Sequence, residues 1–139
     1  MKKISIIFLA LLSFACSQKV TQEQLNLLNG YWEIEKVTFA DGQTKEYTVN
    51  ESIDYIQING LKGFRKKVKP TFEGTYITND DAEFFTLFKK EDTYIIQYKT
   101  EVSDWTETLK TISNDNFSVT NSENITYIYK RYEPINISK

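Results

Sequence analysis

Apolar and polar side chains alternate along most of this chain, with the two-residue period of a β-strand that buries one face. Near the start of the pattern, Trp32 and Ile34 alternate with Glu33. We expect the apolar members of such runs to face a common core and their polar neighbours to face solvent. The later apolar members are Phe64 and Val68, Phe72 and Tyr76, and Tyr94, Ile96 and Tyr98.

The phase of this alternation slips once, near Lys36. Beyond Ile34, the residues Val37 and Phe39 continue the apolar set one position late. A β-bulge inserts one extra residue into a strand and so produces such a slip. The sequence therefore predicts a bulge in the first strand.

Clusters of turn-forming residues separate the alternating runs. Because the intervals are too short for crossover helices, consecutive strands are expected to be antiparallel. The prediction is an all-β fold: an antiparallel up-and-down barrel of about eight to ten strands with a short N-terminal helix. The predicted turns are Asp41-Gly42, Asn59-Gly60, Asn79-Asp80-Asp81, Glu91-Asp92, Ser113 to Asn116 and Asn121 to Asn124.

The short helix is predicted just before the first strand. Thr21 can cap it together with Gln24, three residues further on. Leu25 and Leu28 share one face, and Gly30 suits the left-handed backbone that ends many helices. One or two helical turns are therefore expected between the N-terminal segment and the strands.

The first fifteen residues have the composition of a secretory signal. Lys2 and Lys3 precede an apolar run over 4–12, which is too short to span a bilayer, and small Ala15 precedes Cys16. This arrangement resembles a bacterial lipoprotein signal, which implies that Cys16 is acylated and becomes the new N-terminus. The alternative is a soluble secreted protein with an unmodified cysteine.

These features divide the chain into four parts. Residues 1–15 form the signal peptide, 16–24 the lipidated cysteine and a polar tether, 25–132 the β domain, and 133–139 a C-terminal tail. The lipoprotein resemblance, with Ser17 rather than an acid after the cysteine, implies an anchor in the outer membrane. We expect the domain to face the periplasm.

Composition narrows the chemistry. The 139 residues include no histidine and one cysteine, so histidine-dependent triads, histidine-ligated zinc or haem, and an intrachain disulfide are excluded. Asp54 and Glu107 fall within strand-like runs, but no spacing shows that they converge on a catalytic or metal site. With 17 basic and 19 acidic side chains, nucleic acid is not an expected partner. We predict a monomeric binding protein, not an enzyme, without metal or cofactor.

Two segments resemble the lipocalin-like proteins of the calycin superfamily, and more closely the small lipocalin-like lipoproteins of Bacteroidota. One is Leu-Asn-Gly-Tyr-Trp-Glu-Ile over 28–34, and the other is Tyr-Ile-Tyr-Lys-Arg over 127–131. The resemblance implies that Gly30 and Trp32 lie at a closed end of the barrel. It also implies that a basic residue of the last strand packs across the indole. Arg131 is the first choice for this partner and Lys130 the alternative.

The domain is rich in aromatic residues, which make up 14% of the chain. Tyrosines among apolar residues can line a pocket for a small hydrophobic or amphiphilic ligand, because a phenol offers a ring and a hydrogen bond. Alternation selects Tyr76, Tyr98 and Tyr127 as pocket residues. In the alternative, the aromatic residues fill a barrel without a cavity, which acts as an interaction module of the cell envelope.

One segment carries a high density of positive charge. Its cations form either a basic surface strand that binds an anionic partner or the solvated face of an edge or exterior strand. The residues are Lys62, Arg65, Lys66, Lys67 and Lys69.

Overall fold

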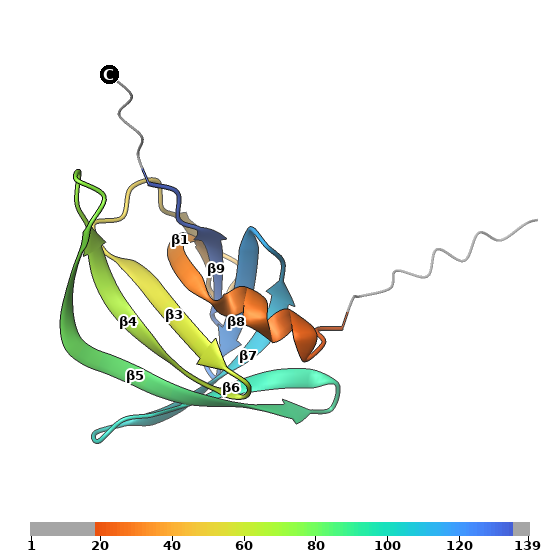
Figure 1. Ribbon diagram of the computed structural model, residues 1–139. Coiled ribbons are helices and arrows are strands. Elements are labelled where there is room, and N and C mark those ends of the chain that lie inside the picture. The colour runs from red at the N-terminus through yellow and green to blue at the C-terminus, as the bar shows by residue number, and fades with distance from the viewer. Residues whose placement is uncertain (1–18, 135–139) are drawn as a thin grey trace, which may run out of the picture.

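The computed structural model describes residues 19–134, which form one 3-10 helix and nine antiparallel strands (Figure 1). Cys16 and the predicted signal peptide lie outside the described residues. Within the described range, no helix has the length and apolar character needed to cross a bilayer. The elements are η1 (Glu23–Leu28), β1 (Gly30–Thr38), β2 (Thr44–Glu46), β3 (Ile53–Asn59), β4 (Lys62–Pro70), β5 (Tyr76–Lys90), β6 (Thr93–Lys99), β7 (Asp104–Ile112), β8 (Asn116–Asn121) and β9 (Thr126–Arg131).

The strands close into a barrel because β1 pairs with two partners. Its first residues pair with β3, and the stretch from Trp32 to Thr38 pairs with the last strand, β9. All other neighbours follow chain order, so β1 and β3 to β9 form an eight-stranded up-and-down barrel. Strand β2 pairs only with the end of β1 and stays outside the closed ring. The predicted all-β, up-and-down architecture with a short N-terminal helix is confirmed.

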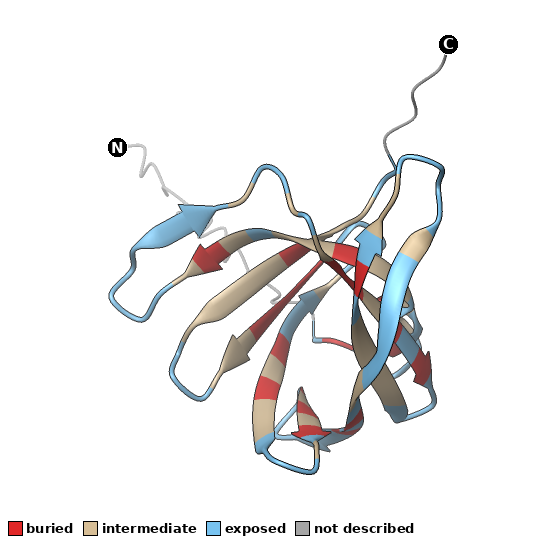
Figure 2. Ribbon diagram, turned by 90° about the vertical axis from the view of Figure 1, so that its left-hand side faces the viewer, coloured by how far each residue is buried: buried red, intermediate tan, exposed pale blue. Residues whose placement is uncertain are grey.

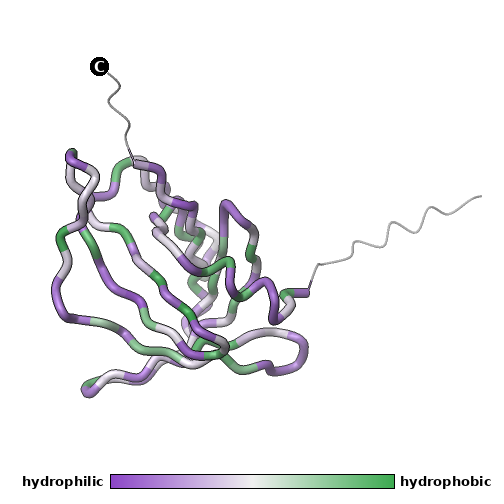
Figure 3. Tube along the Cα trace, viewed as in Figure 1, coloured by the Kyte–Doolittle hydropathy of each residue, from purple (hydrophilic) through white to green (hydrophobic). Residues whose placement is uncertain are grey.

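The predicted bulge in the first strand is also confirmed. The β1–β9 register shifts between Ile34 and Lys36. Trp32 and Ile34 therefore share the inner face with Val37, which pairs with Tyr127. Buried and hydrophobic positions recur along the other strands in the same way, as bands of colour in Figures 2 and 3.

Two features differ from the sequence prediction. Asn79 to Asp81 do not form a turn; they lie within the 15-residue strand β5, opposite a register shift between Lys66 and Val68 of β4. Extra residues on one strand of a ladder bulge outward, and polar side chains suit that position. Val20, in the segment assigned to a polar tether, packs in the hydrophobic core.

The helix covers one end of the barrel. It contacts β3 and β7, and its residues Leu25 and Leu28 are each 1% exposed (Figure 1). Positions three apart are eclipsed in a 3-10 helix, so both leucines point into the barrel. The backbone N–H of Thr21 donates to Gln24 Oε1 at 2.9 Å, which forms one half of the predicted cap.

Apolar side chains fill the half of the barrel beneath this helix. Trp32 lies at the centre of that cluster, is fully buried, and donates from Nε1 to the carbonyl of Leu28 at 2.8 Å. Phe117 meets its indole edge-on at 4.7 Å, and Tyr129 stacks on Phe117 at 4.6 Å. This end of the barrel is therefore closed. The other members of the cluster include Ile56, Ile58, Phe85, Leu87, Tyr94, Ile96, Tyr98, Leu109 and Val119.

Arg131 lies over Trp32, with its guanidinium carbon 4.0 Å from the ring centre. The same guanidinium donates to three backbone carbonyls: those of Leu27 (2.9 Å), Asn29 (2.9 Å) and Asn114 (2.7 Å). One side chain of the last strand thus joins the helix, the first strand and the β7–β8 turn.

Gly30 provides the space that this arrangement needs. Its φ of +123° is unfavourable for other residues, and a Cβ there would stand 2.6 Å from Arg131 Nη1. Lys130 instead points outward and pairs with Glu33 at 3.2 Å.

Arg131→Lys is expected to lower the free energy of unfolding by about 2–4 kcal/mol, because one ammonium cannot replace three directed N–H donors over the indole. Urea denaturation measures the loss. Lys130→Met is the matched control and should change stability by less than about 1 kcal/mol, since it removes only a half-exposed pair. Equal losses in the two variants would show that Arg131 has no special role.

Candidate functional site

Three ionisable side chains are buried in the barrel beyond the apolar cluster: Asp54, Arg65 and Glu107, which are 3%, 16% and 10% exposed. Two more reach this layer from the rim: Glu83 is 42% exposed and Lys67 is 66% exposed. Asp54 and Lys67 form one directly opposed pair of β3 and β4, and Arg65 is opposite Ile56 of the core. Directly opposed residues share a face, so these side chains leave their strands on the inward side. By the same rule Glu83, opposite Arg65, and Glu107, opposite Ile96, are internal on β5 and β7.

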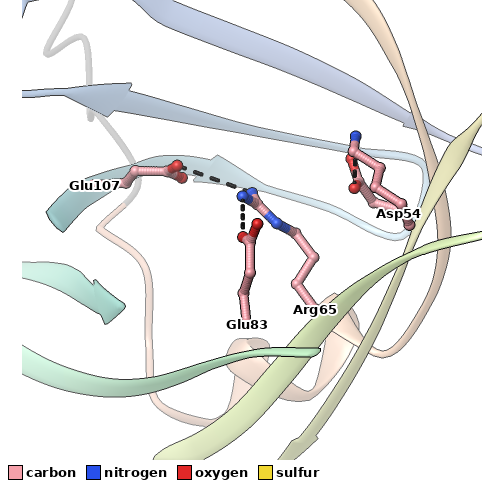
Figure 4. Close-up of polar contacts among 5 residues, drawn as sticks. Asp54, Arg65, Glu83 and Glu107 are labelled. Carbon is pink, nitrogen blue, oxygen red and sulfur yellow. Dashed lines mark hydrogen bonds and ion pairs between the residues drawn. The ribbon is translucent and has the colours of Figure 1, made fainter. Parts of the chain in front are cut away.

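Two of the three carboxylates form short ion pairs. Arg65 Nη2 lies 2.8 Å from Glu83 Oε2, and Lys67 Nζ lies 2.8 Å from Asp54 Oδ1 (Figure 4). The third carboxylate, Glu107, is 3.9 Å from Arg65 Nη1 at its nearer oxygen, which is too far for a hydrogen bond. Its other oxygen, Oε2, is buried and has no hydrogen-bond partner among the described residues.

Aromatic rings frame this charged layer. Tyr98 stacks on Trp105 with ring centres 4.9 Å apart, and the Arg65 guanidinium lies 4.8 Å from the Tyr98 ring centre. Burial raises the pKa of the Tyr98 and Tyr129 phenols well above the ordinary value, so both stay neutral at physiological pH. The layer therefore combines fixed charges with neutral aromatic surface.

Burial also dominates the ionisation of Glu107. It raises the pKa of this carboxyl above the ordinary value, although the nearby Arg65 acts in the opposite direction. The ionised form of Glu107 is thus less stable in the fold than in water.

The layer forms one wall of a pocket of about 1000 Å³ at the end of the barrel opposite η1. Asp54, Arg65, Lys67 and Glu83 line its inner part together with Trp105. The bulge of β5 and the β6–β7 turn complete its outer wall over 79–82 and 99–103. We call this space the mouth pocket. It can accept a small molecule from solvent and present charged and aromatic groups to it.

The three predicted pocket tyrosines do not come together. Tyr98 is 2% exposed in the charged layer, and Tyr127 packs against the core from β9. Tyr76 instead stacks on Tyr31 at 4.2 Å, on the side of β1 opposite to Trp32. Its register partner is Pro70, which shares the outer face of β4 with Val68. Alternation showed which residues share a face, but it assigned Tyr76 to the inner face when it lies on the outer face.

The predicted basic surface strand is also divided between two faces. Lys62, Lys67 and Lys69 are exposed and Lys66 is half-buried, whereas Arg65 turns into the barrel and is 16% exposed. Arg65 is therefore the member of the predicted basic strand that does not belong to its surface. Phe64, expected inside, lies on the outer face because its neighbour Arg65 faces the interior, where it pairs with Glu83.

Sequence reasoning did not assign three lining residues of the mouth pocket, Asp54, Glu83 and Trp105, or the adjacent Glu107. The usable signal was the presence of carboxylates inside runs of strand-forming residues, at Asp54 and Glu107. Such residues are costly at buried positions unless a cation pairs with them. Opposite charges on neighbouring strands could thus have indicated a charged interior.

Similarity to known proteins is limited to solved structures. No family model matches the chain, and no curated protein matches it. Solved structures similar to it include a lipocalin-like protein from Bacteroides uniformis, with 13% identity over 76% of this chain and 99% of that one and a TM-score of 0.48. An uncharacterized protein from Bacteroides eggerthii has 12% identity, the same coverages and a TM-score of 0.47.

Lobster apocrustacyanin A1 is similar at 11% identity over 88% of this chain and 75% of that one, with a TM-score of 0.44. At TM-scores below 0.5 these similarities carry no further argument. The strand order and the first-to-last closure define the class: a closed, antiparallel up-and-down barrel. Its functional chemistry follows from the contacts of this chain.

Glu107→Gln is expected to change how stability depends on pH. Because the folded pKa is raised, the contribution of Glu107 to stability is fully present below the unfolded pKa, near 4.5. It is then lost as pH rises through the folded value. The variant lacks this loss, so its stability relative to the parent should increase from pH 4 to pH 7. Urea titrations at several pH values measure the trend, and a constant or opposite difference contradicts the burial of a poorly paired carboxylate.

Proposed function

We propose that this protein binds a small amphiphilic molecule, without catalysis, at the mouth pocket. The proposal rests on the open pocket of about 1000 Å³, whose lining includes both charged and aromatic side chains. Since apolar side chains fill the other half of the barrel, the ligand would be held near the mouth and not deep in a calyx. An amphiphile suits this place because its polar group can meet the charged layer.

The division of the pocket surface supports such a ligand. Arg65, Glu83 and Asp54 offer directed polar contacts at the inner wall, whereas Trp105 offers a large ring. Val102, 94% exposed on the β6–β7 turn, adds apolar surface at the rim. The alternative of an interaction module without a cavity is less favoured because it gives no role to this pocket.

Binding is favoured over catalysis by the pairing of the charged groups. A general acid or base has to reach the reacting group of its substrate. Arg65, Glu83, Asp54 and Lys67 are instead engaged with one another at 2.8 Å. They are suited to hold a polar group in place.

The two tryptophans provide a direct test, because Trp105 lines the mouth pocket and Trp32 is buried at the closed end. Dodecylammonium, dodecanoate and lysophosphatidylcholine, each below its micelle concentration, are the probes. At least one should change the fluorescence in a saturable way, since it would cover Trp105. In Trp105→Phe the change should disappear. A lack of saturation with all three, or an undiminished change in the variant, would refute the proposal.

We also propose that Cys16 carries a lipid anchor that holds the domain at the outer membrane, facing the periplasm. The sequence of the first sixteen residues supports this. Lys19, where the described chain begins, pairs with Asp92 of the β5–β6 turn at 3.1 Å. Three residues span at most about 10 Å, so the closed end would lie next to the bilayer and the mouth would face away from it.

Cys16→Ser should abolish incorporation of labelled palmitate in the native host and move the protein from the membrane to the soluble fraction. Loss of acyl chains removes about 0.8 kcal/mol of anchoring free energy for each buried methylene. Ser17→Ala is the matched control and should remain labelled. Palmitate incorporation that survives in Cys16→Ser would disprove the anchor.

A further inference from the structure

The charges inside the barrel do not balance one another. Arg65 has its short contact with Glu83, and Lys67 has its short contact with Asp54. These two pairs engage the buried guanidinium of Arg65 and the ammonium of Lys67, whose side chain is 66% exposed. Glu107 is the fifth charge, and it has only a 3.9 Å approach to a guanidinium that is already bound to another carboxylate.

Glu107 has one carboxylate oxygen without a hydrogen-bond donor. Its side chain is 10% exposed, and Oε2 has no hydrogen-bond partner among the described residues. Asp54 Oδ1 also lacks a hydrogen-bond partner there, but it lies 2.8 Å from Lys67 Nζ. A buried carboxylate oxygen without a donor is costly, so such groups in folded proteins generally acquire a proton, an ion or a ligand. Burial also raises the pKa of Glu107, so the fold favours the protonated form of this carboxyl.

Glu107 adjoins the mouth pocket without lining it. Glu107 is two residues from Trp105 on β7, so both side chains lie on the inner face, and Trp105 lines the pocket. Figure 4 shows Glu107 and Arg65 pointing toward each other, with Glu83 reaching the same guanidinium from another direction. A ligand group that passes beside Arg65 would meet both the carboxylate and the aromatic ring.

The pocket as a whole also favours positive charge. Its lining contains five acidic and four basic side chains, and Glu107 lies behind them as one more acid. An ammonium group satisfies a carboxylate oxygen with an N–H donor and is attracted to the face of an indole. A carboxylate ligand would instead add a sixth negative charge to the lining and leave Oε2 without a donor.

We propose that the mouth pocket selects amphiphiles with a single positive charge, whose ammonium group is received by Glu107 beside the ring of Trp105. This inference rests on the proposed function, which requires only that some amphiphile binds. Because Glu107 lies behind the lining and its Oε2 is buried, its side chain has to turn toward the pocket beside Trp105 to accept the ammonium N–H, while Arg65 keeps its contact with Glu83. The apolar chain extends outward along the rim near Val102.

Matched ligands test the preference in the unmodified protein. Dodecylammonium and dodecanoate have the same chain length and opposite charge, and isothermal titration calorimetry at pH 7 below the micelle concentrations measures both. Dodecylammonium should bind at least about tenfold more tightly, since hydrogen bonds to charged groups contribute about 1.5–3 kcal/mol. Equal binding, or tighter binding of dodecanoate, would overturn this inference and leave the proposed function standing. Binding of neither would overturn the proposed function itself.

A pair of variants tests the residue. Glu107→Gln should reduce the preference for dodecylammonium by about tenfold, because the ion pair is lost. Glu33→Gln changes the net charge equally but acts on the outer face, where Glu33 pairs with Lys130, and should keep the preference. If both variants reduce the preference to the same extent, the effect comes from overall charge and the assignment of Glu107 is wrong. If Glu107→Gln does not fold, the comparison of ligands on the unmodified protein still decides.

Discussion

The contact of Arg131 with Trp32 organises this barrel. A closed barrel has to join its first strand to its last, and here one guanidinium covers the indole of β1 while it binds carbonyls of η1, of the residue before β1 and of the β7–β8 turn. Charge-assisted hydrogen bonds to three separate segments restrain their relative positions. The cost of burying the Trp32 N–H is offset by the Leu28 carbonyl. With one end sealed in this way, the interior can open only at the opposite end.

That opening explains why charged residues can lie inside so small a domain. Packing fills the half of the barrel beneath η1, and the strands continue beyond it toward solvent. At that depth a carboxylate remains tolerable if a cation from the next strand is opposite to it, as Lys67 is to Asp54. Glu107 differs from Asp54 because its nearest cation, Arg65, is 3.9 Å away and already pairs with Glu83 at 2.8 Å.

The sequence predicted the architecture because each part of it rests on local signals. The two-residue period defines strands, short intervals force antiparallel neighbours, and the late position of Val37 reveals the bulge after Ile34. The pairing of Trp32 with a basic residue of the last strand followed from a family resemblance, and the structure places Arg131, not Lys130, over the ring. The pocket was less predictable from the sequence. Alternation cannot tell which face of β4 is internal, so Arg65 was expected on the outside. Its interior position depends on Glu83 and Glu107, which are distant from it in sequence.

We propose that the sealed end is structural and that the charged mouth is the binding site. Backbone amide chemical shifts in a ¹⁵N-labelled sample titrated with dodecylammonium test it most directly. The account predicts saturable shifts centred on Arg65, Trp105 and Glu107, and unchanged signals at Trp32 and Arg131. Shifts centred on the outer stack of Tyr31 and Tyr76, or at the sealed end, would contradict it.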